Sequence, residues 1–187
     1  MNVKPTLLAT ALAVACGAMA LIPPAAQAVQ NPSKDGTITI NGLVVANSCT
    51  VNANGTGSSN ATVTLPTVYT GALNAAGVTA GKTAFSIAVT GCDLNLSNVS
   101  AYWSGANIVA GDGNLKNTSA TNNVEVQLLN GDSSVINLAG AQGSQNSKAV
   151  SLSGGAATLS YYAQYYATAA ATPGKLNTNV DFTLVYQ

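Results

Sequence analysis

Apolar and polar residues alternate repeatedly along this chain, and this pattern restricts the possible folds more than any other feature. Phe85, Ile87 and Val89, for example, are each separated by one small residue. A period of two places successive side chains on opposite faces of a β-strand. Each such run therefore predicts one strand. The other runs occupy residues 61–65, 102–103, 124–128, 135–138, 150–152, 159–165 and 180–186.

Turn-forming sequences separate these runs. Asn54-Gly55, Gly154-Gly155 and Pro173-Gly174 are clear examples, because glycine and proline supply the backbone angles that tight turns require. Many short strands divided by such turns predict an all-β protein, either an antiparallel sandwich or a barrel. A helix is expected only around residues 69–76, where it would be one or two turns long.

Residues 1–28 have the pattern of a secretory signal peptide. Lys4 provides a positive charge, an apolar run extends from Leu7 to Ile22, and Ala26-Gln27-Ala28 places small residues at a cleavage site. We therefore expect an exported mature chain of residues 29–187. Cys16 also lies in a weakly lipoprotein-like context, but the usual leucine three residues earlier is missing.

The composition excludes several classes of function. The chain has six basic residues, all lysine, and no histidine. A nucleic-acid partner requires a basic surface, which this composition does not provide. Without histidine, a Ser-His-Asp or Cys-His arrangement is impossible. The carboxylates are scattered singly, mostly beside glycine or in turns: Asp35, Asp93, Asp112, Glu125, Asp132 and Asp181.

We therefore expect no enzyme activity, no cofactor and no metal site. Asp112, in the sequence Gly-Asp-Gly-Asn, is the one position that suggests calcium. A calcium site uses several oxygen ligands, and one carboxylate is too few. A hairpin turn is the better interpretation of this stretch.

Cys49 and Cys92 are the two cysteines of the predicted mature chain. In an exported protein such a pair predicts a disulfide bond, and two thiols without histidine do not suit a metal. In the loop-entropy model, a bond that closes about 44 residues is worth roughly 4 kcal/mol.

Strand-forming sequence is present at both ends of the mature chain. Residues 36–45 read GTITINGLVV, in which Ile38 and Ile40 alternate with threonines, and no turn signal folds them back onto a neighbour. The chain ends on residues 180–187, a strong strand with no later strand to cover its edge. A lone strand is unstable in water, and an uncovered apolar edge promotes aggregation. The sequence thus has a spare strand in front and an uncovered strand at its end.

These features together resemble the structural pilins of chaperone–usher fimbriae, the type 1 fimbrial subunit family. The resemblance covers the whole mature chain, and its ordered motifs are GLVVANSCTV around Cys49, FSIAVTGC ending at Cys92, YYAQYYATAAATPG, and a closing strand with Tyr186 next to last. Each motif alone is weak, and their order is specific.

The resemblance implies an incomplete immunoglobulin-like sandwich that lacks its last strand and is completed by a donor strand from another subunit. It implies a signal peptide (residues 1–28), a donor-strand extension (29–42) and a pilin domain (43–187). Gly36, Ile38 and Ile40 would enter the groove of a neighbouring subunit. The wall of the chain's own groove would be its C-terminal strand, with Val180, Phe182, Leu184, Tyr186 and Gln187.

The same resemblance implies the partners and the location. A periplasmic pilus chaperone would fill the groove first and bind the terminal carboxylate, an outer-membrane usher would export the subunit, and neighbouring pilins would then polymerise with it. The expected function is a structural subunit of a bacterial surface fimbria that supports cell adhesion. The alternatives are a fimbrial tip adhesin and a stand-alone secreted carbohydrate-binding sandwich. Tyr102 and Trp103 could stack on a sugar, but such residues more often fill the core or the rim of a sandwich, and we expect that role here.

Overall fold

The computed structural model describes residues 49–119 and 121–187, so the predicted signal peptide and donor-strand extension lie outside the described residues. Within them, no helix is long and apolar enough to cross a membrane. The predicted helical segment is a single 3-10 turn, η1 (Thr70–Leu73). The strands are β1 (Thr50–Ala53), β2 (Thr79–Thr90), β3 (Asn98–Ser104), β4 (Val124–Asn130), β5 (Val150–Ser151), β6 (Ala157–Ala167) and β7 (Asp181–Tyr186).

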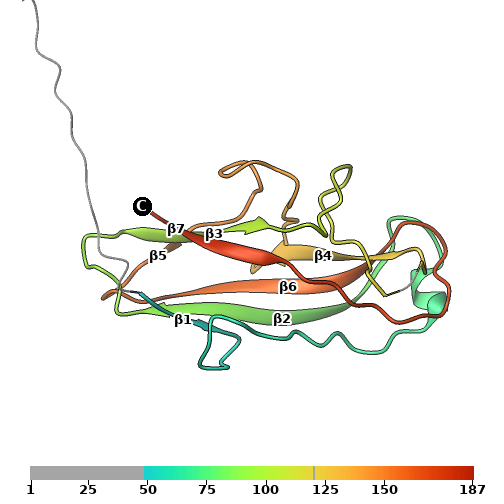
Figure 1. Ribbon diagram of the computed structural model, residues 1–187, viewed down its shortest axis with the longest axis horizontal. Helices are drawn as coiled ribbons and strands as arrows, with labels where there is room; N and C mark the ends of the chain where they lie inside the picture. The colour runs from blue at the N-terminus through green and yellow to red at the C-terminus, as the bar shows by residue number, and fades with distance from the viewer. Residues whose placement is uncertain (1–48, 120) are drawn as a thin grey trace, which may run out of the picture. The chain divides into compact units, whose positions relative to one another are not determined.

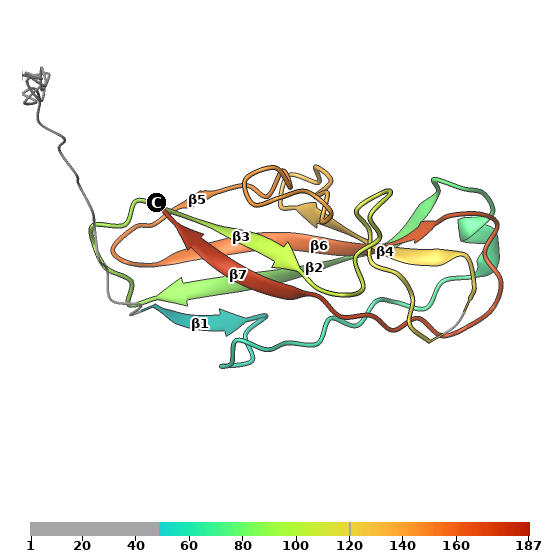
Figure 2. The same cartoon turned by 45° about the horizontal axis from the view of Figure 1, so that its top comes forward.

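The strands form two antiparallel sheets, which confirms the predicted all-β class. One sheet has the order β1-β2-β6-β4 and the other the order β5-β3-β7. Figure 1 shows the strands of both sheets, and in Figure 2 β7 crosses in front of the longer strands β2 and β6 of the first sheet. Strands β2 and β6 pair over most of their length, with an irregularity between Ala80 and Thr83.

The core lies between the two sheets and follows the alternation in the sequence. Ile87 and Val89 of β2, Val99 and Trp103 of β3 and Leu159 of β6 are all buried. Their neighbours in sequence point outward, as the period of two requires.

Aromatic rings form the centre of this core. The ring centroids of Trp103 and Tyr161 are 5.1 Å apart and nearly perpendicular. Phe85 lies 5.6 Å from Tyr161, and Phe182 lies 6.0 Å from Trp103. The Trp103–Tyr161 contact is edge-to-face and the other two are tilted; such aromatic pairs stabilise a core beyond the area that they bury. Trp103 is only 2% exposed, which confirms the expectation that it fills the core rather than stacks on a sugar.

Two predicted strands are not strands in the structure. Residues 61–65 have the expected alternation of side chains, with Val63 and Leu65 half-buried, but no neighbouring strand pairs with them in the described chain. Residues 135–138 bury Ile136 and Leu138, yet they make one isolated bridge, from Val135 to Leu129. The apolar pattern matches the buried side chains in both segments. Residues 61–65 lack a pairing partner among the described residues, whereas residues 135–138 contact β4 too briefly to form a strand.

Candidate functional site

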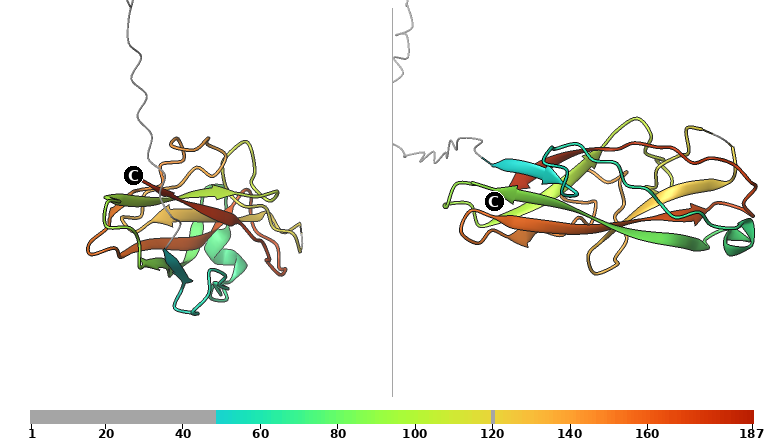
Figure 3. Two further views of the ribbon diagram at one scale, coloured as in Figure 1. Left: turned by 60° about the vertical axis from the view of Figure 1, so that its left-hand side comes forward. Right: turned by 90° about the horizontal axis from the view of Figure 1, so that it is seen from below.

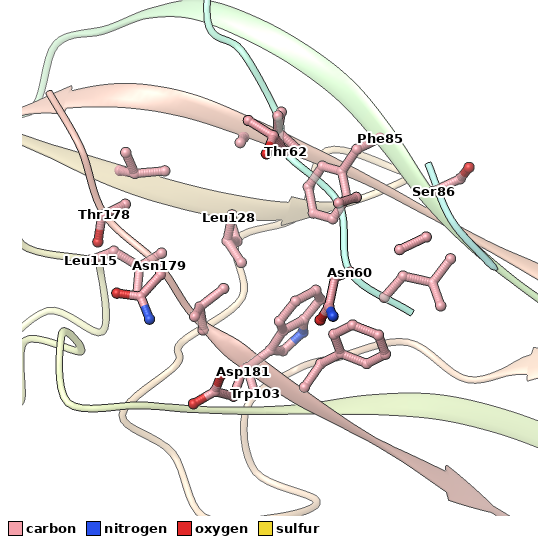
Figure 4. A pocket seen from close by; sticks show the side chains of 18 of the residues that line it. Asn60, Thr62, Phe85, Ser86, Trp103, Leu115, Leu128, Thr178, Asn179 and Asp181 are labelled. Atoms are coloured by element: carbon pink, nitrogen blue, oxygen red, sulfur yellow. The ribbon is translucent and has the colours of Figure 1, made fainter. Parts of the chain in front are cut away.

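An open groove runs along one side of the domain between β7 and the segment of residues 59–65. It encloses about 950 Å³. In Figure 4 the side chains of Phe85, Leu128 and Trp103 lie between the segment that carries Thr62 and the segment that carries Asp181. The groove therefore opens directly onto the hydrophobic core.

The floor of the groove is apolar and nearly free of charge. Phe85 and Ile87 of β2, Trp103 of β3, and Val126 and Leu128 of β4 contribute to it. Among the described residues that line the groove, Asp181 is the one charged side chain. Apolar burial and backbone hydrogen bonds, rather than ion pairs, would therefore hold an occupant here.

The first edge of the groove is β7, which pairs with β3 on its other side. Gln187 and Asn98 exchange two backbone hydrogen bonds, each 2.9 Å long. In an antiparallel pair every second residue faces the partner strand, so the odd-numbered residues of β7 bond to β3. The N–H and C=O groups of Phe182, Leu184 and Tyr186 therefore point toward the groove.

The second edge of the groove is the segment of residues 61–68, of which residues 61–65 line the groove itself. Within the described residues, no backbone N–H or C=O group of this segment takes part in a hydrogen bond. Most residues of this segment are exposed on the rim of the groove, so their backbone groups are accessible to an added strand. Considering only residues 49–119 and 121–187, the groove thus has unpaired backbone on both sides and apolar side chains between, which are the requirements for an added β-strand.

Glycine shapes one end of this site. Gly81 has a φ of +64°, and a Cβ atom at this position would lie 2.8 Å from Cδ2 of Tyr165. Tyr165 lines the groove. Gly81 lies within the irregularity in the β2–β6 pairing, where glycine adopts a positive φ at low cost.

The residues singled out from the sequence divide into three groups. Four of the C-terminal residues line the groove: Val180, Phe182, Leu184 and Tyr186. Gln187 does not line it, and its carbonyl oxygen accepts hydrogen bonds from the backbone N–H groups of Ser97 (2.7 Å) and Asn98 (2.9 Å). The predicted donor residues Gly36, Ile38 and Ile40 lie outside the described residues, so their role stays a prediction.

Cys49 and Cys92 form the predicted disulfide bond. Cys49 lies just before β1 and Cys92 just after β2, and these two strands pair from Thr50–Thr90 onward. Because β1 is the end strand of its sheet, the disulfide fastens an edge that has one neighbouring strand. Val51 and Ala53 of β1 line the groove, so the bond also fixes part of the groove wall.

A second carboxylate, which the sequence pattern did not place there, lies beside the loop of Asp112. Glu125 of β4 accepts a hydrogen bond from Nδ2 of Asn114 (3.2 Å). Burial, and then the neighbouring Asp112 carboxyl, raise the pKa of Glu125 above its usual value. No group of three or more His, Cys, Asp or Glu residues that could hold a metal ion occurs among the described residues.

Sequence reasoning missed the second edge of the groove. The alternation in residues 61–65 identified a strand, but nothing in it showed that this strand borders an opening. The sequence gives no count of the strands that pair with each edge, and among the described residues no strand pairs with the groove side of β7.

Comparison with known proteins identifies relatives that are all fimbrial proteins. A family model described as "Type-1 fimbrial protein, A" matches residues 65–187. The F17 fimbrial protein of Escherichia coli is 42% identical over 161 residues, covering 82% of this chain and 88% of that protein. The major fimbrial subunit SMF-1 of Stenotrophomonas maltophilia is 42% identical over 160 residues, covering 81% and 92%.

The fold also matches solved structures. The crystal structure of the P pilus rod subunit PapA has a TM-score of 0.60 at 19% sequence identity, covering 75% of this chain and 99% of that one. At this identity the match concerns the fold alone. It agrees with the two-sheet architecture and with the sequence relatives.

Proposed function

The chain belongs to the type-1 fimbrial protein family and is a structural fimbrial subunit, and on this premise we propose that it polymerises by donor-strand exchange. In this proposal the groove accepts an extended segment from the next subunit. The single observation that carries the proposal is the pair of unpaired backbone edges, β7 and residues 61–68, on either side of an apolar floor.

The chemistry of the groove supports an extended peptide as its occupant. A strand laid between the two edges would satisfy backbone groups on both sides and place alternate side chains on the floor. Strand addition of this kind is the known mode of chaperone–pilin complexes. A small-molecule ligand fits less well, because it would leave most of the backbone groups on the two long edges unpaired.

The proposed occupant is the extension of another copy, residues 29–42, with Gly36, Ile38 and Ile40 facing the floor. Burial of two isoleucines contributes very roughly 4 to 6 kcal/mol, and each ladder hydrogen bond adds about 1 kcal/mol. Pro32 cannot donate to a ladder, so the strand would be weakest toward its front. The similarity to SMF-1, which is named a major fimbrial subunit, supports a role as a self-polymerising main subunit.

The remaining parts of the proposal concern export. A periplasmic chaperone would protect the groove before assembly, and an outer-membrane usher would deliver the subunit to the cell surface. The protein would act without catalysis, as a building block of a fimbria that supports adhesion. A tip adhesin is the weaker alternative, since the named relatives are fimbrial and rod subunits.

The test is to disable the donor segment without touching the groove. Ile38→Asp with Ile40→Asp would place two charges on an apolar floor, costing several kcal/mol each unless they are neutralised. We expect the chaperone complex to form normally and fibres to be absent. The matched control is Thr37→Asp with Thr39→Asp, which adds the same charges to the opposite face and should still give fibres.

Electron microscopy and boiling-sensitive ladders on denaturing gels measure assembly. Normal fibres from the isoleucine variant would refute the proposal. Loss of the chaperone complex would instead mean that residues 36–40 belong to the fold of their own subunit.

A further inference from the structure

The segment that leads into β7 continues the groove edge beyond the strand itself. Leu176, Thr178 and Val180 are half-buried, while Asn177 and Asn179 are exposed. This is the same parity as in β7, where Phe182, Leu184 and Tyr186 face the groove. All five residues from Leu176 to Val180 border the groove, so the alternation rests on their burial. The backbone is therefore in strand register from residue 176 onward, although β7 begins at Asp181.

What holds this segment is a side chain rather than a strand. β3 ends at Ser104, so within the described residues no sheet strand pairs with Asn177. Where a strand would pair, the side-chain amide of Asn117 forms hydrogen bonds with this segment through both its nitrogen and its oxygen. Nδ2 donates to the carbonyl oxygen of Lys175 (2.7 Å), and Oδ1 accepts from the backbone N–H of Asn177 (3.1 Å).

Asn117 is also fixed on its own side of this contact. Its Nδ2 donates to Oδ1 of Asn122 (3.0 Å), and its Oδ1 accepts from the N–H of Ser119 (3.0 Å). An asparagine amide has two donors and two acceptor sites, so all four are used. The next residue, Thr118, donates to the carbonyl oxygen of Asn177 from both its N–H (2.8 Å) and its hydroxyl (2.9 Å).

These contacts determine which way the backbone points. The N–H and C=O groups of Asn177 are both engaged on the side of Asn117 and Thr118. In an extended chain the neighbouring residues point the other way, so the backbone of Leu176, Thr178 and Val180 is turned toward the groove. Asn179 follows the same pattern, since its carbonyl oxygen accepts from Nδ2 of Asn107 (3.3 Å). Figure 3 shows this segment extending beyond the arrow of β7.

We propose that Asn117 is a positioning residue for assembly: its amide replaces the missing end of β3 and extends the strand-accepting edge from Phe182–Tyr186 back to Leu176. This inference rests on the proposed donor-strand function. Its consequence is that the groove recognises an extended segment along residues 176–186, and that one end of that segment is held only when Asn117 is present.

The experiment uses the mature chain in complex with its chaperone, carrying Ile38→Asp and Ile40→Asp so that its own extension cannot compete. Synthetic peptides provide the donor: residues 29–42, and versions shortened by three residues at one end or at the other. Competition against a labelled 29–42 peptide gives the relative affinities. Asn117→Ala removes all four hydrogen bonds, and Asn95→Ala, in an exposed loop, is the matched control.

In the parent protein, shortening the peptide at either end should weaken binding. In Asn117→Ala, shortening the peptide at one end should no longer weaken its binding, while shortening it at the other end should weaken binding as much as in the parent protein. The full peptide should bind at least about tenfold more weakly than to the parent, the effect of one or two ordinary hydrogen bonds. Asn95→Ala should behave like the parent protein.

If shortening the peptide at each end lowers its affinity equally for Asn117→Ala and for the parent protein, the inference is overturned and the proposed function still holds. Failure of the parent itself to bind the 29–42 peptide would refute the proposed function instead. If Asn117→Ala does not fold, Asn117→Asp retains the two accepting positions and loses the two donating ones, and the same end-specific loss is required of it. Fluorescence of the buried Trp103 reports whether each variant keeps its core.

Discussion

Removal of the disulfide bond should weaken the domain by an amount that the structure allows us to calculate. Cys49 and Cys92 are 43 residues apart in the sequence. In the loop-entropy model, freeing a loop of this length stabilises the unfolded chain by about 4 kcal/mol. Most domains have a total stability of only about 5–15 kcal/mol, so the loss would be a large part of the whole.

The perturbation is Cys49→Ser with Cys92→Ser, which leaves no unpaired thiol. Urea unfolding of the mature chain can be followed by the fluorescence of Trp103, the single tryptophan, which lies in the core. With a slope of about 2 kcal/mol per molar urea, a loss of about 4 kcal/mol lowers the midpoint by about 2 M. Reduction of the parent protein should reproduce the shift, and reductant should not affect the double variant.

A midpoint shift well under 0.5 M, or roughly 1 kcal/mol at this slope, would refute the reasoning. It would mean that β1 merely detaches from β2 when the bond is absent, while the remaining core unfolds as before. Hydrogen exchange at Thr50–Ala53 separates the two cases, because detachment would expose these amides without a global change.

Two further perturbations test other parts of the structure. Glu125→Gln should raise the melting temperature at pH 7, because burial and Asp112 raise the pKa of Glu125 in the folded protein. A carboxyl group with a raised folded-state pKa contributes stability below its unfolded-state pKa, and this contribution is lost as pH rises through the folded-state pKa. The gain should therefore vanish below about pH 4, where the carboxyl is protonated in both states, and a gain that is constant with pH would contradict this cause. Deletion of Leu184–Gln187 removes two groove-facing side chains and half of the β3–β7 pairing, a loss of about 3 kcal/mol or more from burial alone. It should abolish the chaperone complex and expose the subunit to periplasmic proteolysis, whereas Thr183→Ala, at an exposed position, should accumulate normally in immunoblots.

The strands were predictable where a local pattern carries the information. Alternation located β2, β4, β6 and β7, because each has one face toward the core, and export together with a single cysteine pair predicted the disulfide. Residues 61–65 show the limit of this reasoning: the pattern gives the buried face of a segment but not whether a partner exists beside it.

Other contacts in the structure join residues that no periodic pattern in the sequence connects. Asn117 lies far along the chain from Lys175 and Asn177, and one asparagine among many gives no signal of a bridging role. Glu125 was likewise isolated in the sequence, and only the return of the loop beside β4 brings it to Asp112. Such contacts result from tertiary structure and were not available from the sequence.

The two unpaired edges of the groove also have a mechanical consequence. If a neighbour's strand lies between β7 and residues 61–68, tension along a fibre pulls that strand lengthwise, parallel to both edges. The ladder bonds on the two sides then share the load and must break together, rather than opening one after another from an end. Forced separation is governed by the height of its activation barrier, so a joint that exists only after assembly would resist shear more than its modest side-chain contacts suggest.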